Sequence, residues 1–128
     1  MQGSKQKTIL VVEDHPRSRE ILVLQLGRMG YDVVEAEDGE AAMNKALAES
    51  PDLTIMDLWL PRMNGFQVTT KMKGNSQTAH IPVIAYTAAE HKDYKAIALQ
   101  VGMAEFLLKP APAHILEDLI DKFLKDKP

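Results

Sequence analysis

The sequence predicts an α/β fold, a five-stranded parallel sheet with five helices on both of its faces. Three observations lead to this prediction. Short apolar runs alternate with longer segments in which apolar residues recur at three- and four-residue steps. The short runs are apolar without a break, which is typical of strands buried on both faces of a parallel sheet. The alternation fills the chain, and such repeats favour parallel strands joined by crossover helices.

The first two strand–helix repeats have clear boundaries. Thr-Ile-Leu-Val-Val at residues 8–12 predicts a strand, and residues 16–29 predict a helix that a proline opens and a glycine follows. Residues 31–36 predict the second strand. The alanine-rich residues 38–49 predict a helix with Asp38 as its N-cap.

The next two repeats carry a polar residue at a strand end. Residues 53–57 predict a strand that ends on Asp57, and residues 65–73 predict a helix that stops at a Gly-Asn-Ser break. Residues 81–86 predict the fourth strand. A helix is expected from about residue 89 to residue 101, before a glycine.

The fifth repeat completes the domain. Residues 106–108 predict a short strand, and residues 113–124 predict a helix with one apolar face. We therefore expect one folded domain over residues 7–125, with a flexible lead-in at 1–6 and a polar tail at 126–128.

The composition excludes several classes of function. The chain has 128 residues, enough for one core, and its net charge of -3 gives no support to a nucleic-acid surface. It contains no cysteine, which excludes disulfides, thiolate catalysis and cysteine-ligated metal. We find no apolar stretch that would span a membrane and no signal peptide, and we expect a cytoplasmic protein.

Polar residues gather where the predicted strands end. Glu13 and Asp14 follow the first strand, Asp57 ends the third, Thr87 follows the fourth and Lys109 follows the fifth. Parallel sheets of this kind bind ligands at the carboxyl ends of their strands. We therefore expect these five side chains to converge on one site.

The converging residues have a specific chemistry. Three carboxylates at close range repel one another, so a proton or a cation must be bound among them. An all-oxygen ligand set suits Mg²⁺. With Lys109 and Thr87 nearby, the site has the positive charge and the hydroxyl donor that a phosphoryl group requires. Asp57 is then a candidate nucleophile that would form an aspartyl phosphate.

Together these residues resemble a known family, the receiver domains of two-component response regulators. The resemblance covers residues 7–124 and rests on residues in a fixed order: Glu13-Asp14, Asp57, Pro61, Gly65, Thr87-Ala88 and Lys109-Pro110. The stretches Ile-Leu-Val-Val-Glu-Asp, Met-Asn-Gly and Ile-Pro-Val-Ile-Ala-Tyr-Thr-Ala are also similar to the family. It implies a flavodoxin-like (βα)5 fold and a role as a phospho-accepting switch in a phosphorelay.

The resemblance implies a role for each pocket residue. Asp57 would accept a phosphoryl group from a histidine of a kinase or phosphotransfer protein. Glu13, Asp14, Asp57 and the backbone carbonyl of Trp59 would bind Mg²⁺, with Mn²⁺ as an alternative ion. Lys109 would contact first the Asp57 carboxylate and then the phosphoryl oxygens.

The resemblance also implies how the signal would leave the pocket. Thr87 would swing toward the phosphoryl group, and the ring of Phe106 would turn inward with it. Many relatives have tyrosine in place of Phe106, so a partner contact that needs that hydroxyl is not expected here. The output face would be formed by residues 89–101, 106–108 and 113–124, binding a partner protein or a second copy of the chain.

The implied kinase-docking region lies around the first helix and the loop after Lys109, and includes Arg17, Ile21 and Pro110. A monomer or a phosphorylation-dependent dimer is expected. Few residues follow the last helix, so the chain is either a stand-alone receiver or a piece of a hybrid histidine kinase or larger regulator.

Trp59 and Ala89 depart from common forms of the family. They occupy positions that tune dephosphorylation, beside the path of the attacking water. The indole of Trp59 would hinder that water and Ala89 has no polar group to orient it, so slow self-hydrolysis is one hypothesis. The other is that Trp59 anchors a partner protein.

Two other classes of function compete with the switch. Phosphatases and phosphotransferases of other α/β folds carry a second catalytic aspartate two residues after the nucleophile, where this chain has Trp59. We therefore expect no turnover enzyme, only catalysis of the domain's own phosphorylation and dephosphorylation. A phosphorylation-independent interaction module is disfavoured because the pocket set is complete.

Overall fold

The structure, a computed structural model, describes residues 6–125, and each apolar run of the sequence forms a strand in it. The predicted tail and all but the last residue of the predicted lead-in lie outside the described residues. The strands are β1 (Thr8–Val12), β2 (Asp32–Ala36), β3 (Leu53–Met56), β4 (Val83–Thr87) and β5 (Glu105–Leu108). They form one parallel sheet in the order β2-β1-β3-β4-β5.

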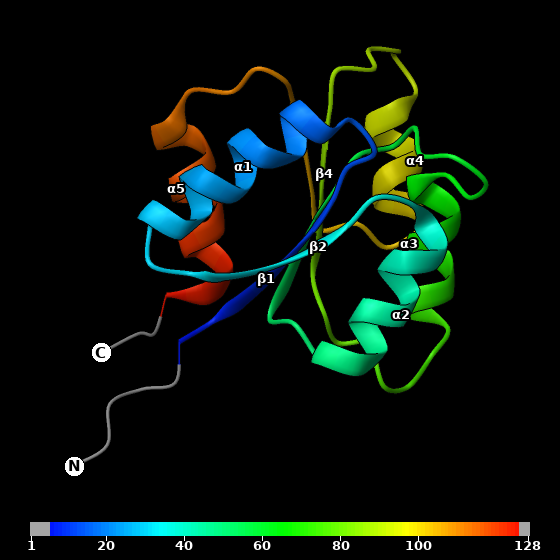
Figure 1. Cartoon of the computed structure of the whole chain (residues 1–128). Coiled ribbons are helices and arrows are strands. Elements are labelled where there is room, and N and C mark those ends of the chain that lie inside the picture. The colour runs from blue at the N-terminus through cyan, green and yellow to red at the C-terminus, as the bar shows by residue number, and fades with distance from the viewer. Residues whose placement is uncertain (1–5, 126–128) are drawn as a thin grey trace.

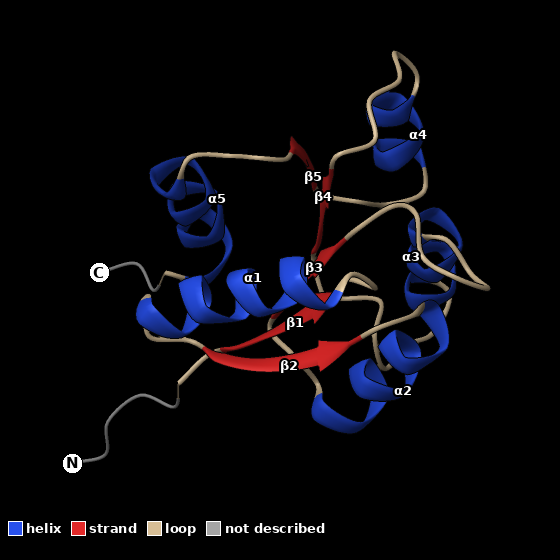
Figure 2. Ribbon diagram, turned by 45° about the horizontal axis from the view of Figure 1, so that its top comes forward, coloured by secondary structure: helices blue, strands red, loops and turns tan. Residues whose placement is uncertain are grey.

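Helices cover both faces of this sheet. They are α1 (Pro16–Arg28), α2 (Gly39–Glu49), α3 (Gly65–Lys73), α4 (Tyr94–Gln100) and α5 (Ala113–Leu124). Figure 1 shows α1 and α5 together on one side and α2, α3 and α4 on the other. In Figure 2 the strands run between these two helical layers. The predicted five-stranded α/β architecture is therefore confirmed.

The alternation of side chains along the strands gives each helical layer its own core. In β1, Ile9 and Val11 pack toward α1 and α5, while Leu10 and Val12 pack toward α2, α3 and α4. All four are buried because helices cover both faces of the strand. The continuous apolar pattern of β1 is a direct consequence of this arrangement.

Side-chain caps fix several helix starts. Asp38 is the N-cap of α2, as predicted, and its Oδ1 accepts a hydrogen bond of 2.8 Å from the amide of Ala41. Asn64 and Gln67 form a reciprocal capping box at the start of α3, with both hydrogen bonds at 2.9 Å. This box sets where α3 leaves the loop that follows β3.

The structure corrects some of the predicted boundaries. β4 begins at Val83 rather than residue 81 and continues through Thr87, while β2 begins at Asp32. The larger difference is α4, which begins at Tyr94 instead of residue 89. Side chains hold the intervening backbone out of the helix: Thr87 Oγ1 accepts from the amide of Ala89 at 3.2 Å, and His91 Nδ1 accepts from that of Asp93 at 3.1 Å.

Among the helices within residues 6–125, none is long and apolar enough to cross a membrane.

Candidate functional site

Carboxylates from two neighbouring strands meet at the carboxyl edge of the sheet. Glu13 and Asp14 directly follow β1, and Asp57 directly follows β3. The strand order reverses between these neighbours, which is where open α/β sheets bind ligands. One carboxylate oxygen from each residue lies within 4.8 Å of the other two. Glu13 is only 4% exposed, whereas Asp14 is exposed and keeps the site open to solvent.

Lys109 supplies the positive charge that this cluster requires. Its Nζ donates hydrogen bonds to Glu13 Oε1 and, at 3.3 Å, to Asp57 Oδ2. Burial by itself lowers the pKa of the Lys109 ammonium, but the hydrogen bond to Glu13 and the charge of Asp57 outweigh burial. The pKa of Lys109 therefore lies above its ordinary value. The ammonium also lies 5.6 Å from the centre of the Tyr86 ring, within reach of a cation–π contact.

Thr87 completes the surroundings of Asp57. Its Oγ1 donates a hydrogen bond of 2.6 Å to Asp57 Oδ1. The amide of Trp59 lies 3.4 Å from the same oxygen. Thr87 is almost fully buried, at 1% exposure, so water cannot replace Asp57 as the acceptor for its hydroxyl. Without a phosphoryl group, the Thr87 hydroxyl therefore contacts the acceptor carboxylate itself, and its predicted swing toward a phosphoryl group stays a prediction.

Tight packing behind the carboxylates holds them in place. A side chain on Gly65 would place its Cβ 2.5 Å from the carbonyl oxygen of Asp57, so only glycine lets α3 approach this closely. The amide of His15 donates to Glu13 Oε2 at 3.0 Å, and Arg19 donates to the Glu13 carbonyl at 2.8 Å. Sequence reasoning missed the contributions of His15 and Arg19, since neither has a spacing signal that ties it to Glu13.

The acidic cluster fits a hard divalent cation. Glu13, Asp14 and Asp57 present oxygen ligands at mutually short range, and Asp14 leaves room for water. Mg²⁺ prefers such ligands and keeps several waters. Lys109 already contacts two of these carboxylates, so cation binding would relieve the remaining repulsion.

A groove of about 320 Å³ opens beside the pocket, between α1 and the loop after β5. Ile21, Pro110 and Lys109 line it together with Glu13 and Tyr86. Two of the three predicted docking residues therefore lie at the groove. The third, Arg17, is exposed but is not a lining residue.

The predicted switch and tuning residues lie in β5 and in the loops after β3 and β4. Phe106 is half-buried in β5 and packs against the core on the side of α2, α3 and α4. Ala89 is half-buried in the loop after β4. Trp59 is 48% exposed, with its ring in edge contact with Phe66 and Tyr94. The sequence did not indicate this aromatic contact, because the three rings come from different elements and share no periodic pattern.

Comparison with known proteins gives consistent matches. The response regulator receiver domain family matches residues 9–121. Protein PilH of Pseudomonas aeruginosa is 33% identical over 116 residues, covering 91% of this chain and 96% of PilH. Histidine kinase P4 of Formosa agariphila is 36% identical over 106 residues, covering 83% of this chain and 8% of that protein. The structure of chemotaxis protein CheY4 of Vibrio cholerae matches with a TM-score of 0.87 and 28% identity, over 94% of this chain and 100% of CheY4.

These matches determine the family. The chain spans less than half the length of several other curated relatives, among them two transcriptional regulatory proteins of which it spans 42% and 45%.

Receiver domains are signalling modules of two-component systems rather than metabolic enzymes. They bind Mg²⁺ at an acidic pocket and interact with histidine kinases or phosphotransfer proteins. By sequence and by fold, the chain belongs to the response regulator receiver domain family.

Proposed function

We propose that this chain is a cytoplasmic phospho-accepting switch, with residues 7–125 as the receiver unit and Asp57 as the acceptor. One observation carries the proposal: Asp57 receives Lys109 on one carboxylate oxygen and Thr87 on the other, beside two further acids. A carboxylate held between an ammonium and a hydroxyl is aligned as a nucleophile. The same donors would face the oxygens of an incoming phosphoryl group.

The proposed reaction moves a phosphoryl group from nitrogen to oxygen. A carboxylate oxygen of Asp57 forms a bond to phosphorus while the bond from phosphorus to the histidine nitrogen of the partner breaks. That nitrogen keeps the electron pair and takes up a proton from solvent. Lys109 stabilises the charge spread over the phosphoryl oxygens. Glu13, Asp14, Asp57 and the backbone carbonyl of Trp59 would hold Mg²⁺ or Mn²⁺, which would supply additional positive charge when bound.

We propose that the response spreads from Thr87 to the output face. Phosphorylation lengthens the Asp57 side chain, so the Thr87 hydroxyl must exchange its present partner for a phosphoryl oxygen. Phe106 lies in the neighbouring strand and would repack with it. A phosphoryl group shifts the equilibrium only if the two states of the domain contact it differently.

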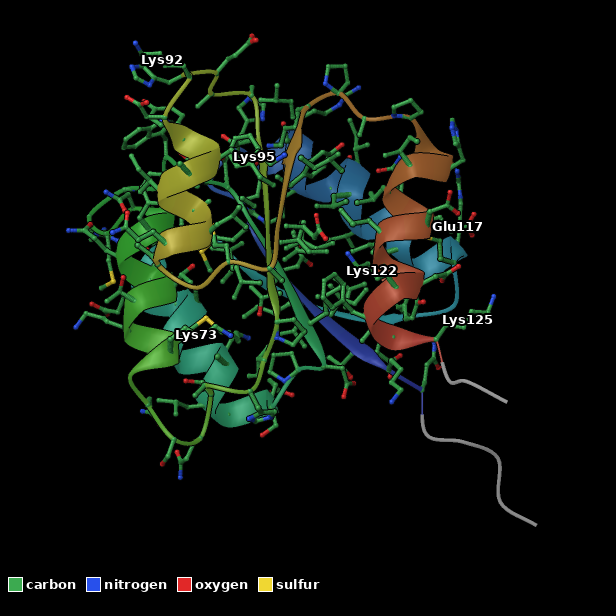
Figure 3. All side chains as sticks on the ribbon, turned by 180° about the vertical axis from the view of Figure 1, so that it is seen from behind. Lys73, Lys92, Lys95, Glu117, Lys122 and Lys125 are labelled. Carbon is green, nitrogen blue, oxygen red and sulfur yellow. The ribbon has the colours of Figure 1, made fainter. Side chains whose placement is uncertain are left out.

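The proposed output face is formed by α4, β5 and α5. Figure 3 shows these elements side by side, with Lys95 labelled on α4 and Lys122 on α5. Lys122 pairs with Glu105 of β5 at 2.6 Å, so an ion pair links α5 to β5 on this face. Repacking of Phe106 within β5 would alter the surface offered to a partner protein or a second copy.

We propose that the phosphodonor protein docks at the groove beside Lys109. Ile21 is 49% exposed on α1 and Pro110 lies across the groove from it, so an apolar helix face of a partner would bury both. Arg17, exposed at the start of α1, would contact the rim. The donor histidine would then approach Asp57 from this side.

Relatives of very different length support two settings for the switch. PilH is nearly coextensive with this chain, which favours a stand-alone receiver. Histidine kinase P4 contains a matching segment within a much longer protein, which favours a piece of a hybrid kinase or larger regulator. The pocket chemistry is the same in both settings.

Intact mass measurement after incubation with acetyl phosphate and Mg²⁺ tests the proposal. We expect a mass gain of one phosphoryl group that is lost in Asp57→Asn and in the presence of EDTA. If no gain is seen, beryllofluoride binding distinguishes a receiver that accepts only its own kinase from an inactive pocket. Failure of both assays would favour a phosphorylation-independent interaction module.

A further inference from the structure

An aromatic cluster lies next to the phosphorylation pocket, formed by Trp59, Phe66, His91 and Tyr94. The ring of Trp59 meets that of Tyr94 edge-on, with 5.7 Å between their centres, and that of Phe66 at 6.4 Å. Phe66 and Tyr94 are also in edge contact, at 6.1 Å. These are favourable geometries for aromatic pairs. Three rings therefore contact one another in all three combinations.

The cluster joins three separate segments of the chain. Trp59 belongs to the loop after β3, Phe66 to the first turn of α3, and Tyr94 is the first residue of α4. The backbone amide of Trp59 lies 3.4 Å from Asp57 Oδ1. Contacts that fix the indole therefore also restrain the backbone of Trp59, which contacts the acceptor carboxylate.

Tyr94 also contacts the imidazole ring of His91. The imidazole of His91 stacks on the Tyr94 ring, with centres 4.9 Å apart and planes at 29°. The Tyr94 amide donates to the His91 carbonyl at 3.1 Å, and the Asp93 amide donates to His91 Nδ1 at the same distance. These bonds shape the turn that delays the start of α4. The late start of the helix therefore places Tyr94 where it meets the indole.

We propose that Tyr94 is a positioning residue for the pocket, which acts by holding Trp59 and thereby the loop that carries the proposed carbonyl ligand. The inference rests on the proposed function, because it assigns that loop a role in cation binding. A loop ordered before the ion arrives loses less entropy on binding, so packing by Tyr94 raises the affinity for Mg²⁺. It also links α4, part of the proposed output face, to the pocket through Trp59.

The contact uses the ring of Tyr94, and this decides the choice of variants. Tyr94→Phe keeps the edge contact, whereas Tyr94→Leu keeps apolar volume but removes the ring. Tyr31→Leu is the matched control, since Tyr31 packs against the opposite core and its hydroxyl lies 3.4 Å from Asp121. Trp59 is the only tryptophan, so its fluorescence reports the indole without interference.

Two measurements on each protein test the proposal: Trp59 emission without metal, and Mg²⁺ affinity by calorimetry. We expect Tyr94→Leu to shift the emission to the red and to weaken Mg²⁺ binding by about two- to ten-fold, the equivalent of one aromatic pair. Tyr94→Phe and Tyr31→Leu should match the wild type in both. If Tyr94→Leu does not fold, His91→Ala replaces it, because that exposed ring supports Tyr94 from outside and its loss should change both readouts in the same direction.

The outcomes separate this inference from the proposed function. A wild type that binds no Mg²⁺ would contradict the proposed cation site itself, and this inference with it. A wild type that binds Mg²⁺, with Tyr94→Leu indistinguishable from it in affinity or in emission, would overturn only the role of Tyr94. Equal weakening in Tyr31→Leu would also overturn it, since a general loss of stability would then explain the effect.

Discussion

At the scale of single residues, the central feature is a carboxylate placed at the end of an apolar strand. Asp57 would be costly there without partners, because burial penalises an unpaired charge. Lys109 and Thr87 provide those partners, and each comes from the end of a different strand. The position of Asp57 therefore depends on three strands being parallel and adjacent in the observed order.

Trp59 carries the prediction that belongs to this scale. We expect Trp59→Asn to lose its phosphoryl group faster than the wild type, by about ten-fold or about 1.4 kcal/mol in activation free energy. The smaller amide would open the path of the attacking water and would offer a hydrogen-bond partner to orient it. The decay of the phosphorylated mass with time measures the rate.

Trp59→Phe is the control, because it keeps an aromatic ring at this position without adding a polar group. Its decay should resemble that of the wild type. A Trp59→Asn protein that decays no faster would refute the hydrolysis hypothesis and leave Trp59 as a partner anchor, the alternative that its 48% exposure also permits.

At the scale of elements, the start of α3 determines the geometry around Asp57. The helix approaches so closely that the amide of Gly65 donates to the carbonyl of Leu58 at 2.7 Å. An ion pair of 2.7 Å between Arg62 and Asp38 ties the same loop to the N-cap of α2. The loop after β3 is thus held by both neighbouring helices.

Gly65→Ala should disturb this arrangement. Its Cβ would lie 2.5 Å from the Asp57 carbonyl and 3.0 Å from the Leu58 Cα, and backbone atoms cannot move aside easily. We expect a loss of about 1–3 kcal/mol in the free energy of unfolding, as for other overpacked sites. We also expect reduced phosphorylation by acetyl phosphate. To relieve the clash, α3 and the backbone of Asp57 must move apart, which displaces the acceptor carboxylate. Urea unfolding and intact mass measure the two effects.

Gly27→Ala is the matched control for this change. Gly27 lies within α1, and an added Cβ there has no neighbour within 4 Å. Alanine is the better helix former by up to about 1 kcal/mol, so this variant should be stabilised and phosphorylated normally. Equal behaviour of the two variants would contradict the proposed role of close packing at Gly65.

The helices and strands also show how much of the structure can be predicted from the sequence alone. Apolar periodicity predicted all five strands and five helices, and the rule that ligands bind at strand ends predicted the convergence of Glu13, Asp57, Thr87 and Lys109. The start of α4 was predicted wrongly because alanine propensity is weak against specific hydrogen bonds from Thr87 and His91. The aromatic cluster and the Arg62–Asp38 pair are contacts between different elements, and periodicity within one element contains no information about them.

At the scale of the whole molecule, one sheet separates two cores that share its strands. Neighbouring residues of β1 face opposite layers, so neither layer can lose its packing without affecting strands that support the other. This arrangement predicts that the domain unfolds as one cooperative unit, as is usual for single domains of this size. It also means that a spectroscopic probe on one face of the sheet should detect a destabilising substitution on the other face.

Leu116→Ala tests this coupling. Leu116 is a fully buried residue of α5, in the core on the opposite face of the sheet from Phe66 and Tyr94, which contact Trp59. Truncating it should lower the free energy of unfolding by about 2–5 kcal/mol, through lost apolar burial and the cavity left behind. Urea unfolding followed by Trp59 fluorescence and by far-ultraviolet circular dichroism should give coincident midpoints, both shifted equally from the wild type. A fluorescence midpoint that stays at the wild-type value while the dichroism midpoint falls would mean that the two layers unfold separately, which would contradict the single cooperative unit.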